Sequence, residues 1–294
     1  MRALIKPFSL SCLICSVLYV FSSVADAAAQ EEGKSLTFLA VGLDDSPSNT
    51  DVLSVITYDS GANTVRALQI PRDTCVRYGD KIIKINAFYS QKLIDGERSD
   101  QALMSLSDMV SGLLGIKIDG YAALTTDGFI DFVDFVGGID VNSSDIPHQI
   151  QDSFSSKDGK VHLDGKSALR FVRYRKEYLR GDLERLDTQK IFAKSLFSSL
   201  KDKREIFSLF KFISNNDGIS FDIDKGRSLS FMLQNVFKAS DADFQIATLP
   251  GKSVKSEGVW YYIINKGEAE SLIKGYFPYS TLGFDTENNF VYNL

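Results

Sequence analysis

An arginine-rich segment is the part of the sequence that points most directly to chemistry. Five arginines fall between residues 170 and 185 of a 294-residue chain whose formal net charge is −5. A solvated helix face in an acidic protein would more naturally mix lysine with glutamate. Arginine instead carries a planar, permanently charged fork that can bind two phosphate oxygens at once. The segment therefore favours an anion-binding site, with basic decoration of two helix ends as the alternative.

A second cationic patch lies earlier in the chain. Arg72 follows a predicted strand, where α/β proteins place ligand-binding residues, and Asp73 could orient its guanidinium. Lys84 and Asn86 alternate with isoleucines, which predicts that they share one face of a strand. A surface salt bridge at Arg72 and a solvated strand face at Lys84 are the alternatives. Together the two patches predict a pocket for a condensed anion, most simply a pyrophosphate.

Two carboxylates are expected at neighbouring strand ends. Asp44 follows a predicted strand over 36–43, and Asp51 opens the next one over 52–58. Such carboxylates can share a hard cation such as Mg²⁺, which prefers oxygen ligands and often bridges protein to phosphate. The alternative is a polar loop without a metal. Asp44 and Asp51 are therefore the candidate metal ligands.

The spacing within the arginine segment restricts its backbone. Arg173 and Arg175 would point roughly 200° apart on one helix. They can converge on a ligand only if the helix ends near Phe171 and the chain then extends. Arg185 and Gln189 stand four residues apart, which places both on one face of the following helix.

Composition and periodicity indicate an α/β or α+β protein with a large core. The chain is 44% hydrophobic and 24% charged, and its net acidity argues against non-specific nucleic-acid binding. Predicted strands and helices alternate without repeats. The predicted strands are 36–43, 52–58, 64–70, 121–125, 139–141, 244–249 and 259–264, with a turn at 59–63; the predicted helices begin near 99 and 166 or span 127–138, 183–200, 227–238 and 267–273.

The N-terminus is typical of a targeting segment. Arg2 and Lys6 precede an apolar stretch over 8–24, which is followed by small residues. We expect residues 1–28 to be a signal peptide or an uncleaved signal anchor. Residues 29–294 are expected to form a single domain outside the cytoplasm, either released or held at the outer face of the membrane.

Cysteines and histidines are too few for several classes of site. Cys12 and Cys15 lie within the expected signal segment, which leaves Cys75 as the one cysteine of the mature chain. An intrachain disulfide framework is therefore excluded. His148 and His162 are the only histidines, so a histidine-rich zinc site or a Ser-His-Asp triad is poorly supported.

Taken together, these motifs resemble the LytR-CpsA-Psr family of bacterial cell-wall glycopolymer transferases. The resemblance covers about residues 36–200 and is specific because seven short motifs occur in family order with suitable spacing. The matching stretches are 41–44, 49–51, 70–74, 84–87, 127–134, 136–139 and 163–189.

The resemblance implies an α-β-α layered fold, with a central mixed sheet flanked by helices and an apolar pocket for a lipid. It implies a Mg²⁺-dependent phosphotransferase that moves a glycopolymer from a polyprenyl-pyrophosphate carrier at the membrane surface to a peptidoglycan hydroxyl. The resemblance also implies roles for residues of both patches. Asp44 and Asp51 would serve the metal and catalysis; Arg72, Lys84, Arg173, Arg175, Arg185 and Gln189 would surround the pyrophosphate, with Arg72, Arg173 and Arg175 also catalytic.

The sequence departs from the family pattern at two positions. Asn49 and Ser46 stand where the family often has arginine. These departures leave open a non-catalytic protein that binds polyprenyl pyrophosphate or regulates through it. A lipid pyrophosphatase that uses water as the acceptor also stays open, because the choice of acceptor depends on the shape of the pocket.

Overall fold

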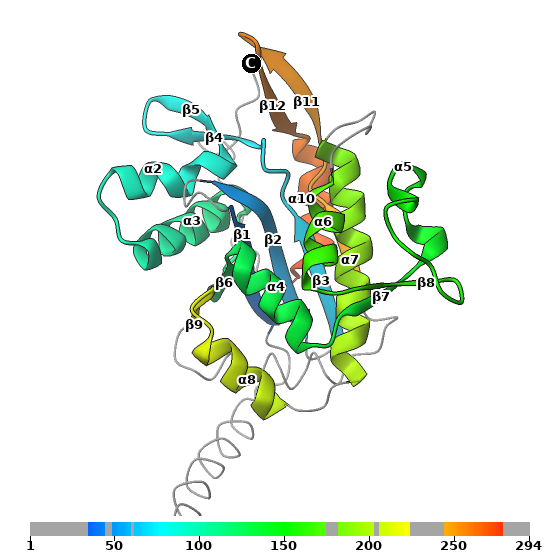
Figure 1. The fold of residues 1–294 in the computed structure, drawn as a ribbon. Helices are drawn as coiled ribbons and strands as arrows, with labels where there is room; N and C mark the ends of the chain where they lie inside the picture. The colour runs from blue at the N-terminus through cyan, green and yellow to red at the C-terminus, as the bar shows by residue number, and fades with distance from the viewer. Residues whose placement is uncertain are drawn as a thin grey trace, which may run out of the picture.

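A six-stranded mixed sheet forms the centre of the molecule (Figure 1). The computed structural model describes residues 35–44, 49–59, 62–174, 182–202, 206–223 and 244–278. Two pairs of neighbouring strands, β10 with β3 and β1 with β6, are parallel, and the other neighbours are antiparallel. In spatial order the strands are β10 (Phe244–Thr248), β3 (Thr64–Gln69), β2 (Thr50–Asp59), β1 (Ser35–Leu43), β6 (Gly120–Leu124) and β9 (Ile219–Ile223).

Three antiparallel hairpins lie outside this sheet. Two of them stand at the same end of the molecule, at the top of Figure 1, where residues Thr74 and Tyr262 form a bridge between them. The hairpins are β4 (Cys75–Tyr78) with β5 (Lys81–Lys84), β7 (Ile139–Asn142) with β8 (Lys160–Leu163), and β11 (Gly251–Ser256) with β12 (Val259–Ile264).

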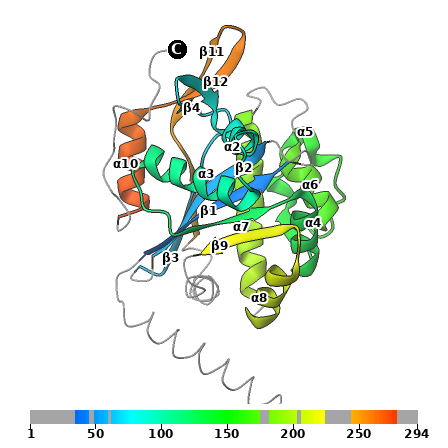
Figure 2. The same ribbon diagram turned by 90° about the vertical axis from the view of Figure 1, so that its left-hand side faces the viewer.

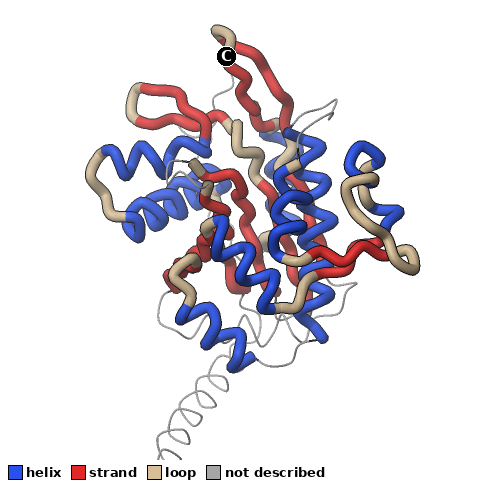
Figure 3. Tube along the Cα trace, viewed as in Figure 1, coloured by secondary structure: helices blue, strands red, loops and turns tan. Residues whose placement is uncertain are grey.

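Helices cover both faces of the central sheet, which gives three layers (Figures 2 and 3). One layer contains α2 (Phe88–Ile94), α3 (Ser99–Leu114) and α10 (Lys266–Tyr276). The opposite layer contains α4 (Thr126–Phe135), α6 (Gly165–Arg173) and α7 (Asp182–Asp202). The remaining helices of the described chain are α5 (His148–Gln151), α8 (Ile206–Asn215), and the 3₁₀ turns η1 (Ile85–Ala87) and η2 (Ser143–Asp145).

The central strands are buried on both faces because side chains alternate along a strand. On β2, Val55 belongs to the core beneath α3, whereas Tyr58 faces the other way and packs with Phe197 of α7. Strands covered on both sides form nearly continuous apolar runs rather than alternating ones. This accounts for the uninterrupted hydrophobic stretch that predicts β1.

The turn between β2 and β3 has the local chemistry that its sequence predicts. The Asp59 carboxylate accepts a hydrogen bond from the Ala62 backbone amide at 3.0 Å. Asn63 adopts a left-handed φ of 48°, and its side chain accepts a hydrogen bond from the Tyr58 hydroxyl at 3.0 Å. Asparagine tolerates this conformation well, so the predicted hairpin turn is confirmed.

The mixed sheet flanked by helices is confirmed, as are the seven predicted strands from 36–43 to 259–264 and the predicted helices that begin near 99 and 166 or span 127–138, 183–200 and 267–273. The structure adds elements that the sequence did not reveal, notably β9 and β11. It also places the predicted strand at 139–141 in a separate hairpin with β8. The predicted helix at 227–238 and the expected signal segment 1–28 lie outside the described residues.

None of the helices that the structure describes combines the length and the hydropathy of a membrane-spanning segment.

Candidate functional site

Asp44 and Asp51 lie at the same end of the central sheet, as their positions in the sequence predict. Asp44 directly follows β1, and Asp51 is the second residue of β2. The Asp44 amide donates a hydrogen bond to the carbonyl of Asn49 at 3.0 Å. This bond continues the β1–β2 pairing past the end of β1, and so holds the two aspartates at one edge of the sheet.

A β-bulge sets the position of Asp51. Gly42 pairs with Val52, and Leu43 pairs with Thr50, so Asp51 is an extra residue on β2. Bulges bend a strand locally and redirect a side chain, and they are common beside active sites. The bulge therefore distinguishes Asp51 from the regularly alternating side chains of the rest of β2.

Asp51 is held between two arginines. Its Oδ1 lies 2.8 Å from Nη1 of Arg72 and 3.7 Å from Nη1 of Arg185. Arg185 also donates from Nη2 to the backbone carbonyl of Asp51 at 3.3 Å. The Arg185 side chain is only 1% exposed, and a charge at that depth requires a compensating partner. The Asp51 carboxylate provides that partner, so it stabilises the buried Arg185 in the folded protein.

Backbone hydrogen bonds fix the loop that carries Arg72. The Ile70 amide donates to the Leu53 carbonyl at 2.9 Å, which holds the end of β3 against β2. Thr74 closes the turn by donating its amide to the Pro71 carbonyl at 2.9 Å. This turn directs Arg72 toward Asp51.

The expectation that Asp73 orients Arg72 is wrong. Asp73 instead pairs with Lys84, whose Nζ lies 2.9 Å from Asp73 Oδ1. Lys84 therefore pairs with the residue that follows Arg72 and lies within the same patch. The expected common strand face of Lys84 and Asn86 is also wrong. β5 ends at Lys84, and Ile85–Ala87 form the 3₁₀ turn η1, so Asn86 lies outside the strand.

Arg173 approaches the site from the opposite helical layer. Its Nη2 donates a 2.7 Å hydrogen bond to Oγ1 of Thr126, the first residue of α4. The same nitrogen lies 3.7 Å from Asp44 Oδ1. Arg173 is 31% exposed, so its guanidinium is open to a ligand as well as to Asp44. The structure thus brings Arg72 and Arg173 to the two aspartates of one site.

The backbone after Arg173 changes direction as the spacing of the arginines requires, but two residues later than expected. α6 continues to Arg173 rather than ending near Phe171, and Tyr174 is extended, with φ −61° and ψ 133°. Arg175 lies outside the described residues, so its predicted role stays a prediction.

Arg185 and Gln189 share a buried face of α7, which confirms the predicted spacing. Gln189 Nε2 lies 3.5 Å from the Val172 carbonyl, at the end of α6. Gln189 is 7% exposed, and Thr188 beside it is fully buried. The structure therefore places Gln189 as a brace between α7 and the helix that carries Arg173, close to the arginines.

Two residues that position parts of the site, Gln69 and Thr126, were not predicted from the sequence. Gln69 donates from Nε2 to the Leu186 carbonyl at 3.2 Å and accepts from the Thr248 hydroxyl at 3.2 Å, which joins β3, β10 and α7. Thr126 accepts the hydrogen bond from Arg173 described above. A glutamine directly after the apolar pair Ala67-Leu68 at the end of a strand is the one sequence signal that could have revealed Gln69. Thr126 offers none, because a threonine at a helix start is ordinary.

The cysteine near the site is not a nucleophile. Cys75 is buried, and burial raises the pKa of its thiol to about 11. The reactive thiolate is therefore almost absent at neutral pH. The charged groups that the structure brings together at this site are the arginines and the aspartates.

The arrangement suits a doubly charged anion together with a divalent cation. Within the part of the chain that the structure describes, the guanidiniums of Arg72, Arg173 and Arg185 lie close to the carboxylates of Asp44 and Asp51. The described residues hold no cluster of three or more His, Cys, Asp or Glu side chains that could bind a metal. Mg²⁺ is often bound by only one or two carboxylates together with substrate phosphates and water. Asp44 and Asp51 fit that kind of site.

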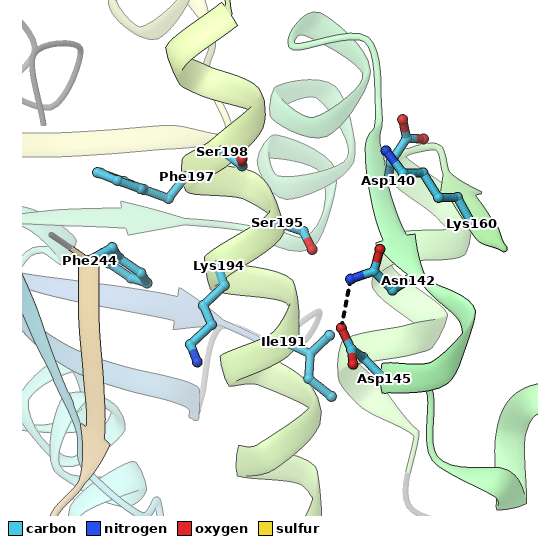
Figure 4. Close-up of a pocket in the computed structure, with 10 residues that line it drawn as sticks. All are labelled: Asp140, Asn142, Asp145, Lys160, Ile191, Lys194, Ser195, Phe197, Ser198 and Phe244. Carbon is cyan, nitrogen blue, oxygen red and sulfur yellow. Dashed lines mark hydrogen bonds between the residues drawn. The ribbon is translucent and has the colours of Figure 1, made fainter. Parts of the chain in front are cut away.

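A separate cavity of about 670 Å³ lies along α7 and the β7–β8 hairpin (Figure 4). Asp140 and Asn142 border it from β7, and Lys194 and Ser195 border it from α7. Neither aspartate nor any arginine of the candidate site lines this cavity. Its mixed polar lining also differs from the apolar lipid pocket that the family resemblance implies, so that pocket stays a prediction.

Comparisons with known proteins agree with the motifs. The sequence model of the LytR_cpsA_psr family matches residues 21–276. The polyisoprenyl-teichoic acid–peptidoglycan teichoic acid transferase TagU of Oceanobacillus iheyensis is 28% identical over 248 residues, which are 81% of this chain and 74% of TagU. TagV of Bacillus subtilis, whose name describes the same activity, is 32% identical over 206 residues, 65% of this chain and 50% of TagV. The crystal structure of B. subtilis TagV superposes with a TM-score of 0.65 at 26% identity, over 84% of this chain and 98% of that one.

Proposed function

Because the chain belongs to the LytR_cpsA_psr family, we propose that it is a glycopolymer–peptidoglycan phosphotransferase. Its substrate would be a glycopolymer linked through pyrophosphate to a polyprenyl carrier, and its acceptor a hydroxyl of peptidoglycan. The relatives support the overall reaction, since TagU and TagV are both named as enzymes that attach teichoic acid to peptidoglycan. The observation that carries the proposal is the convergence of Arg72, Arg173 and Arg185 on two aspartates.

In this proposal, the arginines bind the pyrophosphate and stabilise the charge that develops on it. The side chains of Arg173 and Arg72 are 31% and 22% exposed, so both can meet phosphate oxygens of a substrate that enters the site. Arg185, which is nearly inaccessible to solvent, holds Asp51 in place through its contacts to the carboxylate and the backbone carbonyl. Preorganised cations of this kind stabilise a transferring phosphoryl group with little covalent chemistry by the protein.

The two aspartates receive different roles from their surroundings. Asp51 is 16% exposed and lies 2.8 Å from Arg72, whereas Asp44 is 36% exposed and lies 3.7 Å from Arg173. Asp44 is thus better placed to accept the proton of the attacking hydroxyl. Asp51 would anchor the arginines and offer an oxygen to Mg²⁺. When bound, Mg²⁺ would neutralise charge on the pyrophosphate oxygens.

The proposed reaction is balanced without an additional reactant. The acceptor oxygen bonds to the phosphorus nearest the glycan while the bridging bond to the polyprenyl phosphate breaks. The hydroxyl proton passes to Asp44, and polyprenyl monophosphate leaves. The product is a glycopolymer joined to peptidoglycan through a phosphodiester.

Mass analysis of the products tests this proposal. The full chain is incubated with Mg²⁺, a synthetic polyprenyl-pyrophosphoryl oligosaccharide and peptidoglycan fragments. We expect a fragment enlarged by the oligosaccharide phosphate, together with polyprenyl monophosphate. Release of free oligosaccharide phosphate at the same rate with and without fragments would identify a pyrophosphatase instead. Bound but unchanged substrate would indicate a binding protein.

A matched pair of variants connects the reaction to the site. Arg173→Ala removes the guanidinium beside Asp44, and we expect it to weaken both binding and transfer. Arg170→Ala removes an arginine of the same helix whose guanidinium lies instead 5.6 Å from the Phe154 ring centroid. Equal losses in the two variants would contradict the assignment of Arg173.

The proposal places the enzyme outside the cytoplasm. A carrier lipid and peptidoglycan meet at the outer face of the cytoplasmic membrane, and residues 1–28 have the composition of an export segment. Mass analysis of the native protein would reveal Met1 if the segment acts as an anchor, and a start near residue 28 if it is cleaved. Recovery of the native protein from the cytoplasm would contradict export.

A further inference from the structure

The tip of the β11–β12 hairpin presents two large apolar side chains to solvent. Val259 is 43% exposed and Trp260 is 54% exposed. Among the exposed large hydrophobic residues of the described chain, they alone are neighbours in sequence. Because side chains alternate along a strand, the two point to opposite sides of the ribbon. Single exposed apolar residues are ordinary, but an adjacent pair at a protruding tip indicates a surface that something covers.

Positive charge lies along this hairpin. Lys252 and Lys255 are exposed on the paired strand, with Lys252 opposite Ile263 and Lys255 opposite Trp260. The Nζ of Lys255 lies 5.9 Å from the centre of the Trp260 ring. An indole beside a lysine is a combination that proteins place at the headgroup level of membranes, where the ring is amphipathic and the ammonium stays in water.

The neighbouring β4–β5 hairpin adds to the same charge. Arg77 and Lys81 are exposed there, against one exposed carboxylate, Asp80. The β11–β12 hairpin carries two exposed lysines against Glu257. The exposed groups of the two hairpins are thus four cations and two anions, an excess of two positive charges on a chain whose net charge is −5. This local sign favours an anionic partner.

The β11–β12 hairpin is hydrogen-bonded directly to the loop that carries Arg72. The Tyr262 amide donates a 2.8 Å hydrogen bond to the carbonyl of Asp73, the residue after Arg72. The Tyr262 hydroxyl donates to the Leu249 carbonyl at 2.7 Å, which fixes the base of the hairpin. Trp260 is two residues from Tyr262, so the tip extends roughly 7–10 Å beyond this junction at about 3.3 Å per residue. A surface that holds the tip therefore also sets the position of Arg72.

We propose that the tips of the β11–β12 and β4–β5 hairpins dock on an anionic phospholipid surface. Trp260 and Val259 would enter the headgroup region, while the lysines and Arg77 would lie over anionic headgroups. Docking would hold the arginine site within roughly 10 Å of the headgroups, where the pyrophosphate of a lipid-linked substrate emerges. This inference rests on the proposed function for its purpose, but its physical basis is the hairpins alone.

Trp260 makes the proposal directly measurable because it is the only tryptophan of the chain. The full chain is mixed with phosphatidylglycerol vesicles that contain lipids brominated on their acyl chains. We expect a blue shift of the tryptophan emission, quenching by the brominated lipids and protection from acrylamide. Pure phosphatidylcholine vesicles should give a much weaker response. Binding through residues 1–28 does not produce this signal, since the hairpin itself is the reporter.

Two variants test the charge and the location. The double variant Lys252→Gln/Lys255→Gln retains Trp260. Each of the two lost lysines should weaken the phosphatidylglycerol-dependent response by about fivefold. Met104→Ala is the matched control, because Met104 is 48% exposed on α3 but belongs to neither hairpin. It should respond like the wild type. Equal quenching in the double variant and the wild type would remove the electrostatic part of the proposal.

The remaining outcomes separate docking from catalysis. Emission that stays unshifted and open to acrylamide on phosphatidylglycerol vesicles would overturn the proposal, as would a shift produced only by soluble peptidoglycan fragments. Transfer by the double variant should fall with vesicle-embedded substrate and stay normal with detergent-solubilised substrate. If the wild type fails to transfer in detergent but is quenched on vesicles, the proposed function fails while the docking surface stands.

Discussion

Replacing Asp51 with asparagine should damage folding and catalysis together. The substitution keeps the shape of the side chain but removes the negative charge that lies 2.8 Å from Arg72 and 3.7 Å from Arg185. Arg185 is 1% exposed, so water cannot replace the lost countercharge. The matched variant Asp44→Asn removes a carboxylate that is 36% exposed and lies 3.7 Å from Arg173. It should damage catalysis alone.

The size of the stability effect follows from the burial of Arg185. Removing one partner of a buried ion pair costs about 3–5 kcal/mol. The contact to Asp51 Oδ1 is long, and Arg185 keeps its hydrogen bond to the Asp51 carbonyl, so we expect about 2–3 kcal/mol. For a domain of this size that corresponds to a melting temperature lower by about 5–10 °C. Asp44→Asn should change the free energy of unfolding by less than about 0.5 kcal/mol, as exposed pairs do.

Thermal or denaturant unfolding of the two variants and the wild type provides the comparison, alongside transfer rates measured well below the melting temperature. Both variants should lose transfer by about 10²–10³-fold, the usual loss when a preorganised charged group is removed from an active site. An unchanged melting temperature in Asp51→Asn would refute the view that Asp51 compensates Arg185. A melting temperature that falls equally in both variants would refute the distinction between the two aspartates.

Three further perturbations test separate parts of the structure. Thr126→Val removes the acceptor of the 2.7 Å hydrogen bond from Arg173 and should slow transfer about tenfold with little loss of stability; an unchanged rate would show that Arg173 needs no such support. Raising the pH from about 9 to about 11 should destabilise the wild type more than Cys75→Ala, because the Cys75 thiol ionises in the unfolded chain while its raised pKa keeps it neutral in the folded protein. A free energy of unfolding that falls equally with pH in the two proteins would contradict this. Gly138→Ala should cost about 1–3 kcal/mol of unfolding free energy, because Gly138 has a φ of +77° and an added Cβ would lie 2.5 Å from His162 Nε2; a wild-type denaturation midpoint would argue against that strain.

The sequence predicted the central strands well because their burial on both faces gives long apolar runs. The helix that carries Arg185 and Gln189 was also predictable, since four-residue spacing has a fixed geometrical meaning. Arg173 was recognisable because arginine clusters are unusual in an acidic chain, and Arg72 because it follows a predicted strand. These features depend on local sequence, and the structure agrees with them.

The remaining features depend on contacts between distant segments. The bulge at Asp51 is a matter of register between two strands and leaves no mark in either sequence. The pairing of Lys84 with Asp73 depends on where β5 ends, and alternating residues alone predicted a longer strand. Thr126 meets Arg173 across 47 positions in the sequence. Such partners are selected by tertiary packing, so residue type and spacing could not identify them.

The position of the substrate can be observed in a crystal structure of the full chain with Mg²⁺ and a short-chain polyprenyl pyrophosphate. We expect the pyrophosphate to lie between Arg72 and Arg173, with the cation beside Asp44 and Asp51. Difference density for the pyrophosphate in the cavity along α7 and the β7–β8 hairpin, with the arginine site unchanged, would contradict it.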